Sequence, residues 1–166
     1  PDRAFIDAMH KALGEGGIIA EDLGYLTPEV KAMLAASGYP GMKIMQFAFD
    51  SREPGNYLPY TYPRNSVVYT GTHDNETLAG WYAGLSIEAK TQVRNYLSDY
   101  YTPDDRMYKV LINLAMTAVA KDCIVPIQDH LGLGNEARMN QPGTVGFNWR
   151  WRLLPGQLTD ALAQEL

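Results

Sequence analysis

The sequence has little cysteine, few histidines, few basic residues and no long apolar run, and each shortage excludes a class of protein. The one cysteine, Cys123, cannot form an internal disulfide, which suits a reducing cytoplasm. The three histidines are scattered without metal-ligand spacing, so we expect no metal site. With 14 basic and 19 acidic residues, the chain lacks the basic surface that nucleic acids require. No apolar run reaches about 18 residues and no signal peptide is recognisable, so we expect no membrane association.

Length and composition favour a globular domain. The chain has 166 residues, about the size of one domain, and 46% of them are hydrophobic, which argues against disorder. It begins at Pro1 rather than at a methionine. We therefore expect residues 1–166 to form a single-domain fragment of a longer protein.

Short apolar runs alternate with helical patterns along the chain. Strands are expected at residues 18–20, 43–49, 67–70 and 123–127. Helices are expected at residues 7–13, 28–36, 77–83, 87–100, 105–120 and 158–166. Continuous apolar strands separated by helices are typical of a parallel sheet that is buried on both faces. The pattern predicts an α/β fold, either a (β/α) barrel or a flavodoxin-like open sheet that lacks a glycine-rich phosphate loop.

Polar side chains follow the expected strands, at the end where a (β/α) barrel carries its active site. Glu21 comes directly after the first strand, and His73 and Asp74 come directly after the third. A carboxylate at such a rim is partly desolvated, and the resulting rise in its pKa suits a general acid. Position alone leaves other roles open, namely a helix cap or an ion-pair partner for Glu21 and a helix-capping turn for residues 73–75.

Two further features have both a functional and a structural interpretation. The loop at residues 56–63 is rich in proline and tyrosine, so it is either a rigid aromatic surface for sugar rings or a well-packed surface loop. Cys123 opens an expected buried strand, and we interpret it as inert packing.

Four stretches of the sequence together resemble one enzyme family, the 4-α-glucanotransferases known as amylomaltases or disproportionating enzymes, in the α-amylase clan. The stretches are IAEDLG at 19–24 with TPEV at 27–30, GMKIMQFAF at 41–49, NYLPY at 56–60 with YTGTHDN at 69–75, and QD at 128–129 with EARMN at 136–140 and NWRW at 148–151. They follow the order and spacing of the family and cover nearly the whole chain.

The resemblance implies the C-terminal part of a (β/α)8 barrel, about strands five to eight. It implies that Glu21 is the general acid/base and that Asp74 binds sugar hydroxyls and stabilises the transition state. His73, Phe47 and Asn140 correspond to substrate-binding residues. The implied substrates are maltooligosaccharides and glucose, and no cofactor is implied.

One departure from the family is large. Retaining chemistry needs a nucleophilic carboxylate about 5–5.5 Å from the acid/base. In the family this is an aspartate in an Arg-x-Asp-His context, which does not occur in the sequence. We therefore expect that the whole protein is a cytoplasmic 4-α-glucanotransferase. We also expect that this chain by itself is inactive. The alternatives are a non-catalytic sugar-binding or structural half-barrel, and a hydrolase. Open sheet edges in such a fragment would also favour self-association.

Overall fold

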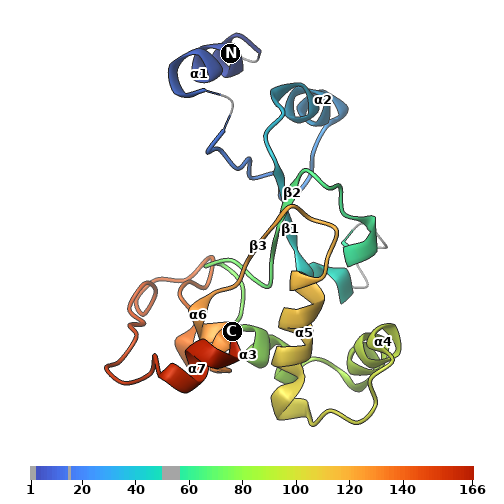
Figure 1. Cartoon of the computed structure of the whole chain (residues 1–166), viewed down its shortest axis with the longest axis vertical. Helices are drawn as coiled ribbons and strands as arrows, with labels where there is room; N and C mark the ends of the chain where they lie inside the picture. The colour runs from blue at the N-terminus through green and yellow to red at the C-terminus, as the bar shows by residue number, and fades with distance from the viewer. Residues whose placement is uncertain (1–2, 15, 50–56) are drawn as a thin grey trace. The chain divides into compact units, whose positions relative to one another are not determined.

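The computed structural model describes residues 3–14, 16–49 and 57–166, so Asn56 of the predicted aromatic loop lies outside the described residues. The chain, whose helices and strands are labelled in Figure 1, divides into two compact units. The first comprises Pro1–Tyr69 and Leu114–Ile124, and the second comprises Thr70–Asn113 and Val125–Leu166. The single domain expected for residues 1–166 stays a prediction.

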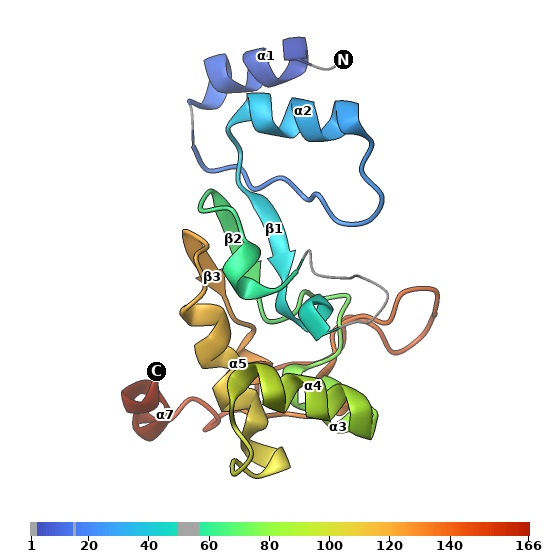
Figure 2. The ribbon, with the colours of Figure 1, turned by 90° about the vertical axis from the view of Figure 1, so that its right-hand side faces the viewer.

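Within its described residues, the first unit contains a parallel sheet of three strands in the order β1, β2, β3. The strands are β1 (Gly41–Ile44), β2 (Ser66–Tyr69) and β3 (Asp122–Ile124), and Figure 2 shows them side by side. Met42 pairs with Val67, and Val68 pairs with Cys123. Helices separate these strands along the sequence, which confirms the predicted α/β fold with a parallel sheet.

Three expected strands are shorter than the sequence predicts, and one of them, expected at residues 123–127, ends at Ile124. In the described part of the segment at residues 18–20, the strand is reduced to one isolated parallel bridge between Ala20 and Gly41. The next strand ends at Ile44, and Met45–Phe49 form a 3-10 helix, η1. The apolar run continues through η1 because part of that helix is also buried. Hydrophobicity alone therefore could not separate the strand from the helix.

The burial expected for β3 is not found. All three of its residues are exposed, although the sequence predicts a buried strand. Cys123 is one of these exposed residues, so its interpretation as buried packing is wrong for this chain. Ile124 is 42% exposed at the same end of the sheet. An apolar strand at the end of a sheet has the sequence pattern of a buried one but lacks a neighbour.

Both helices expected in the first unit are present, although the first begins at Arg3 rather than at residue 7. They are α1 (Arg3–Leu13) and α2 (Pro28–Ser37), with a short 3-10 helix, η2 (Pro59–Thr61). Thr27 caps α2, because its side chain accepts a hydrogen bond from the Val30 N–H. Gly38 ends α2 with a φ of 71°, a conformation that glycine adopts without strain.

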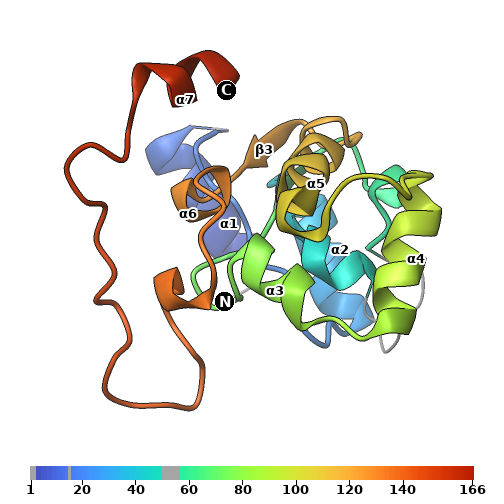
Figure 3. The ribbon, with the colours of Figure 1, turned by 90° about the horizontal axis from the view of Figure 1, so that it is seen from below.

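The second unit is mainly helical. Its elements are α3 (Leu78–Gly84), α4 (Ile87–Leu97), η3 (Asp104–Arg106), most of α5 (Met107–Met116), α6 (Ile127–His130), η4 (Asn135–Ala137) and α7 (Asp160–Glu165). Leu78, Tyr82, Val93, Met107 and Leu111 are buried and form its core. Figure 3 shows the long irregular segment, in orange to red, that joins η4 to α7. Among the described residues, no helix is long and apolar enough to cross a membrane.

Candidate active-site loop

The loop at residues 71–77 leads from the end of β2 to α3 in the second unit, and it carries His73 and Asp74. Asn75 closes a tight turn in it, because its Oδ1 accepts from the Thr72 N–H at 2.9 Å and from the Thr72 hydroxyl at 2.8 Å. The Asp74 N–H also donates to Thr72 Oγ1, at 3.3 Å. The turn fixes the backbone of His73 and Asp74, whose side chains are 58% and 48% exposed.

Two neighbours orient the Asp74 carboxylate. The Asn140 amide Nδ2 donates to Asp74 Oδ1 at 2.6 Å. His73 Nε2 lies 3.4 Å from the same oxygen, an ion pair when the imidazole is protonated. Three residues that the sequence analysis singled out are therefore in contact. About half of the Asp74 side chain remains open to a ligand.

Arg138 joins the two segments of this cluster, and the sequence analysis gave it no role. Its Nη2 donates to the Asp74 carbonyl at 2.6 Å, and its Nε donates to the Asn140 carbonyl at 2.8 Å. The Asn140 N–H donates to the His73 carbonyl at 3.0 Å. The one sequence signal for Arg138 was its place two residues before Asn140 in the EARMN stretch. Its planar guanidinium holds two backbone carbonyls in a fixed arrangement.

The Trp149 ring packs beside the His73 ring, and the sequence analysis assigned Trp149 no separate role. The two ring centroids are 5.1 Å apart, with the planes tilted by 41°. The Trp149 N–H donates to the Met139 carbonyl at 2.6 Å, and its φ is 66°, an uncommon value for a bulky residue. Such backbone conformations need support from their surroundings and are frequent at binding sites. The indole is half exposed and presents a flat apolar surface.

A small cavity of about 150 Å³ lies against the loop at residues 71–77. Its walls include Thr72 and His73 from the loop, and Gln128, Asp129 and Arg138 from the segment that starts at α6. Hydroxyl, imidazole, amide and guanidinium groups line the cavity, together with apolar side chains such as Pro126 and Met139. The arrangement can bind hydroxyl groups and can hold a carboxylate in one orientation.

Glu21 lies in the first unit, away from the cluster around Asp74 in the sequence. It is exposed, so the desolvation expected at a strand rim is not found in this chain. The neighbouring Asp22 has the structural role, since its Oδ1 accepts from the Met42 N–H at 2.6 Å and Lys43 Nζ lies 3.9 Å from its Oδ2. Glu21 and Asp74 belong to different units. Their common pocket therefore stays a prediction.

Phe47 also belongs to the first unit, and it lies in η1 rather than in a strand. Its ring meets Tyr57 edge to face, with 5.4 Å between the centroids. Lys43 Nζ lies 5.4 Å from the centroid of the same Tyr57 ring. Tyr57 therefore packs within its own unit. The role of Phe47 in substrate binding stays a prediction. Among the described residues, no group of three or more His, Cys, Asp and Glu side chains could hold a metal ion.

Carboxylate, amide and imidazole groups can hydrogen-bond to hydroxyl groups, and the indole beside them offers a flat apolar face. The comparison with family models is specific: the chain belongs to the 4-alpha-glucanotransferase family, whose model matches residues 1–159. The chain is 46% identical to the 4-alpha-glucanotransferase of Synechocystis sp., with all of the chain and 33% of that relative covered. It is 43% identical to the enzyme of Thermus thermophilus, with 96% of the chain and 33% of that relative covered.

Solved structures agree with this assignment. Amylomaltase from Streptococcus agalactiae, in complex with acarbose, matches with a TM-score of 0.89 and 35% identity, over 99% of this chain and 33% of that one. Amylomaltase from Corynebacterium glutamicum matches with a TM-score of 0.60 and 20% identity, over 86% of this chain and 25% of that one, which supports the fold alone. The chain thus spans about a third of the length of the curated relatives it matches.

Proposed function

We propose that the protein containing this chain is a 4-α-glucanotransferase, which transfers an α-1,4-glucan segment from a maltooligosaccharide to glucose or to another glucan. The observation that carries the proposal is the family match over residues 1–159, together with 40% to 46% identity to bacterial relatives of that name. The complex of the S. agalactiae amylomaltase with acarbose supports an oligosaccharide ligand. The parallel strands suit a part of a (β/α)8 barrel, about strands five to eight.

In the proposed mechanism, Glu21 protonates the leaving glycosidic oxygen while an aspartate outside this sequence forms the glycosyl–enzyme bond. Glu21, now ionised, then takes the proton of the acceptor 4-hydroxyl as that oxygen attacks the sugar and releases the aspartate. Asp74, oriented by Asn140 and His73, binds hydroxyls of the sugar at the reacting centre. Phe47 provides an aromatic contact for the donor. The carboxylates carry every proton and covalent step, so the proposal includes no cofactor.

Two alternatives remain within this proposal. The absence of an Arg-x-Asp-His stretch favours a non-catalytic sugar-binding or structural role for the isolated chain. A hydrolase would use the same groups with water as the acceptor. A cytoplasmic location is proposed as well, although the potato relative, 42% identical, is described as chloroplastic or amyloplastic.

Incubation with maltotriose separates these functions. A transferase converts it into glucose and a ladder of longer glucans, whereas a hydrolase yields only glucose and maltose. The intact protein should give the ladder, and Asp74→Asn should reduce it strongly while Asp105→Asn, an exposed carboxylate in η3, does not. Products no longer than maltotriose would contradict the transfer function. Turnover by residues 1–166 alone within tenfold of the intact protein would contradict the need for an additional nucleophile.

The sheet of the first unit supports a second property of the isolated chain, self-association through a second copy. β3 is exposed at one end of the sheet, and the other end carries a single bridge at Ala20. Strand edges of this kind present unpaired backbone groups to another chain. Light scattering at micromolar concentration should give a mass above the 18.5 kDa of the monomer. A monomer with a cooperative melt would contradict this property.

A further inference from the structure

A single buried carboxylate joins the two ends of the loop that carries His73 and Asp74. Asp129, in α6, is 1% exposed. The Thr70 hydroxyl donates to its Oδ2 at 2.6 Å, and the Leu78 N–H donates to its Oδ1 at 2.7 Å. Thr70 directly precedes the loop at residues 71–77, and Leu78 directly follows it. Each carboxylate oxygen therefore holds one end of the loop.

Burying the Asp129 carboxylate costs free energy, so packing alone does not explain why an aspartate stands at this position. Burial raises the pKa of the Asp129 carboxyl, and the bonds from Leu78 and Thr70 oppose that rise. An apolar residue of similar volume would avoid the desolvation cost of a buried charge. Both bonds are short, as is typical of hydrogen bonds to an ionised carboxylate.

Other tethers act on the same loop from the exposed side. Asn135 Nδ2 donates to Glu76 Oε1 at 2.6 Å, and Asn140 Nδ2 donates to Asp74 Oδ1 at 2.6 Å. These contacts orient individual side chains in partial contact with solvent. The bonds of Asp129 differ because they are buried and act at the two ends of the loop, on the Thr70 hydroxyl and on the Leu78 N–H. They set the span that the loop must bridge.

We propose that Asp129 is a positioning residue that clamps both ends of the loop at residues 71–77, and that Thr70 is its partner at the first end. This inference rests on the transferase function proposed above, because it assigns the clamp the task of keeping Asp74 in place. Asp129 acts through the loop rather than on the sugar, because it is 1% exposed and both of its oxygens already accept hydrogen bonds. When one end is released, the loop gains freedom and Asp74 moves away from the reacting sugar. A misplacement of about 1 Å can reduce a rate by about a hundredfold.

Substitutions of Thr70 test the clamp in the intact protein. Thr70→Val keeps the shape and removes the hydroxyl, whereas Thr70→Ser keeps the hydroxyl and should restore function. Ser66→Ala is the matched control, since its buried hydroxyl donates to the Pro63 carbonyl at 2.6 Å at the opposite end of β2. We expect kcat with maltotriose to fall about tenfold to a hundredfold in Thr70→Val, with KM within about threefold. Thr70→Ser and Ser66→Ala should stay within about threefold of the parent in kcat.

Amide hydrogen exchange of the same variants gives a readout that does not depend on activity. In Thr70→Val, residues 71–77 should exchange at least about tenfold faster, while residues 41–44 of β1 keep their rate. Faster exchange in a protein without glucan transfer would support the clamp and contradict the proposed function. Unchanged exchange in the loop would overturn the clamp, and so would an equal rise in β1. Faster exchange with unchanged kcat would overturn the positioning role.

Discussion

The two carboxylates assigned to catalysis, Glu21 and Asp74, are held in very different ways. Asp74 lies in a loop with a tight turn of its own and receives hydrogen bonds from Arg138 and Asn140. Glu21 is exposed and follows a single bridge at Ala20, and the next residue, Asp22, anchors the segment to β1.

The difference lies in how many elements of the chain support each carboxylate. The contact between Asp74 and Asn140 joins residues 66 positions apart, and it is one of several between the same two segments. In the described part of the chain, the Glu21 segment is held by the Asp22 side chain and by the bond from the Ala20 N–H to the Pro40 carbonyl. Local opening is easiest where buried contacts and hydrogen bonds are few. We therefore expect Asp74 to be preorganised within this chain and Glu21 to be less so.

The largest expected effect is that of Glu21→Gln. The amide keeps the size of the side chain but cannot exchange a proton, so kcat with maltotriose in the intact protein should fall by about a thousandfold. Because Glu21 is exposed, the melting temperature should change little. Glu29→Gln, at an exposed position in α2 of the same unit, is the control and should retain activity. Retention of more than about a tenth of the parent rate would remove Glu21 from the role of acid/base.

A smaller loss is expected from Asn140→Ala, which removes the amide that orients Asp74. Asp74 stays in its turn, so we expect kcat to fall by about thirtyfold, less than for the loss of a proton-transfer group. Asn65→Ala provides the comparison, since its Nδ2 donates to the Gly38 carbonyl at 3.0 Å in the first unit. Steady-state kinetics on both variants measures the difference. Equal rates in the two would show that the orientation of Asp74 does not depend on Asn140.

Local sequence signals predicted those parts of the molecule that local chemistry determines. The Thr27–Pro28 start and the Gly38 end of α2 follow from capping and backbone preferences, and the structure confirms both. The parallel sheet also followed from alternating apolar and helical patterns. The predictions of a strand at residues 18–20 and of a buried β3 were wrong. Both features depend on neighbouring strands, which an apolar run does not specify.

The candidate site shows the same limit. The resemblance singled out His73, Asp74 and Asn140, and the structure places them in contact, although their roles stay predictions. Arg138 and Asp129 received no role, because their contacts lie 64 and 51 to 59 residues away along the sequence. An arginine in a loop, or an aspartate in a four-residue helix, has no periodic pattern that would indicate such a partner.

Gly41→Ala should weaken the anchor of the Glu21 segment. A Cβ on Gly41 would lie 2.5 Å from Asp22 Oδ2, so Asp22 must move and its bond to the Met42 N–H is lost. We expect the free energy of unfolding to fall by about 1–3 kcal/mol, as for other overpacked sites. Gly84→Ala, at the end of α3, has open space around its Cβ and should be neutral or slightly stabilising. Urea unfolding measures both, and equal midpoints would contradict the anchor.

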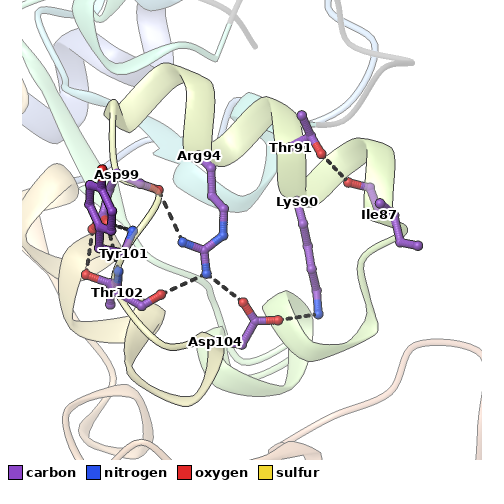
Figure 4. Close-up of polar contacts among 8 residues, drawn as sticks. All are labelled: Ile87, Lys90, Thr91, Arg94, Asp99, Tyr101, Thr102 and Asp104. Carbon is purple, nitrogen blue, oxygen red and sulfur yellow. Dashed lines mark hydrogen bonds and ion pairs between the residues drawn. The ribbon is translucent and has the colours of Figure 1, made fainter.

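The smallest expected effect concerns a network away from the site, where Asp104 accepts from Arg94 Nη2 at 2.6 Å and from Lys90 Nζ at 2.9 Å (Figure 4). The Arg94 and Lys90 contacts hold the pKa of Asp104 below its usual range. A carboxyl whose pKa is lower in the folded state stabilises the fold at pH values above its unfolded pKa, about 3.9. This stabilisation is lost as the pH falls through the lower, folded value.

Asp104→Asn should therefore lower the free energy of unfolding at neutral pH by less than about 1 kcal/mol, because the side chain is 54% exposed and solvent screens the pair. The deficit should shrink as the pH falls below about 4 and when salt is added. Asp105→Asn is the adjacent control. Because the network does not touch residues 71–77, transfer activity should remain unchanged in both variants. A stability deficit independent of pH and salt would show that Asp104 acts through packing rather than charge, and a fall in kcat would extend the network of tethers that supports Asp74.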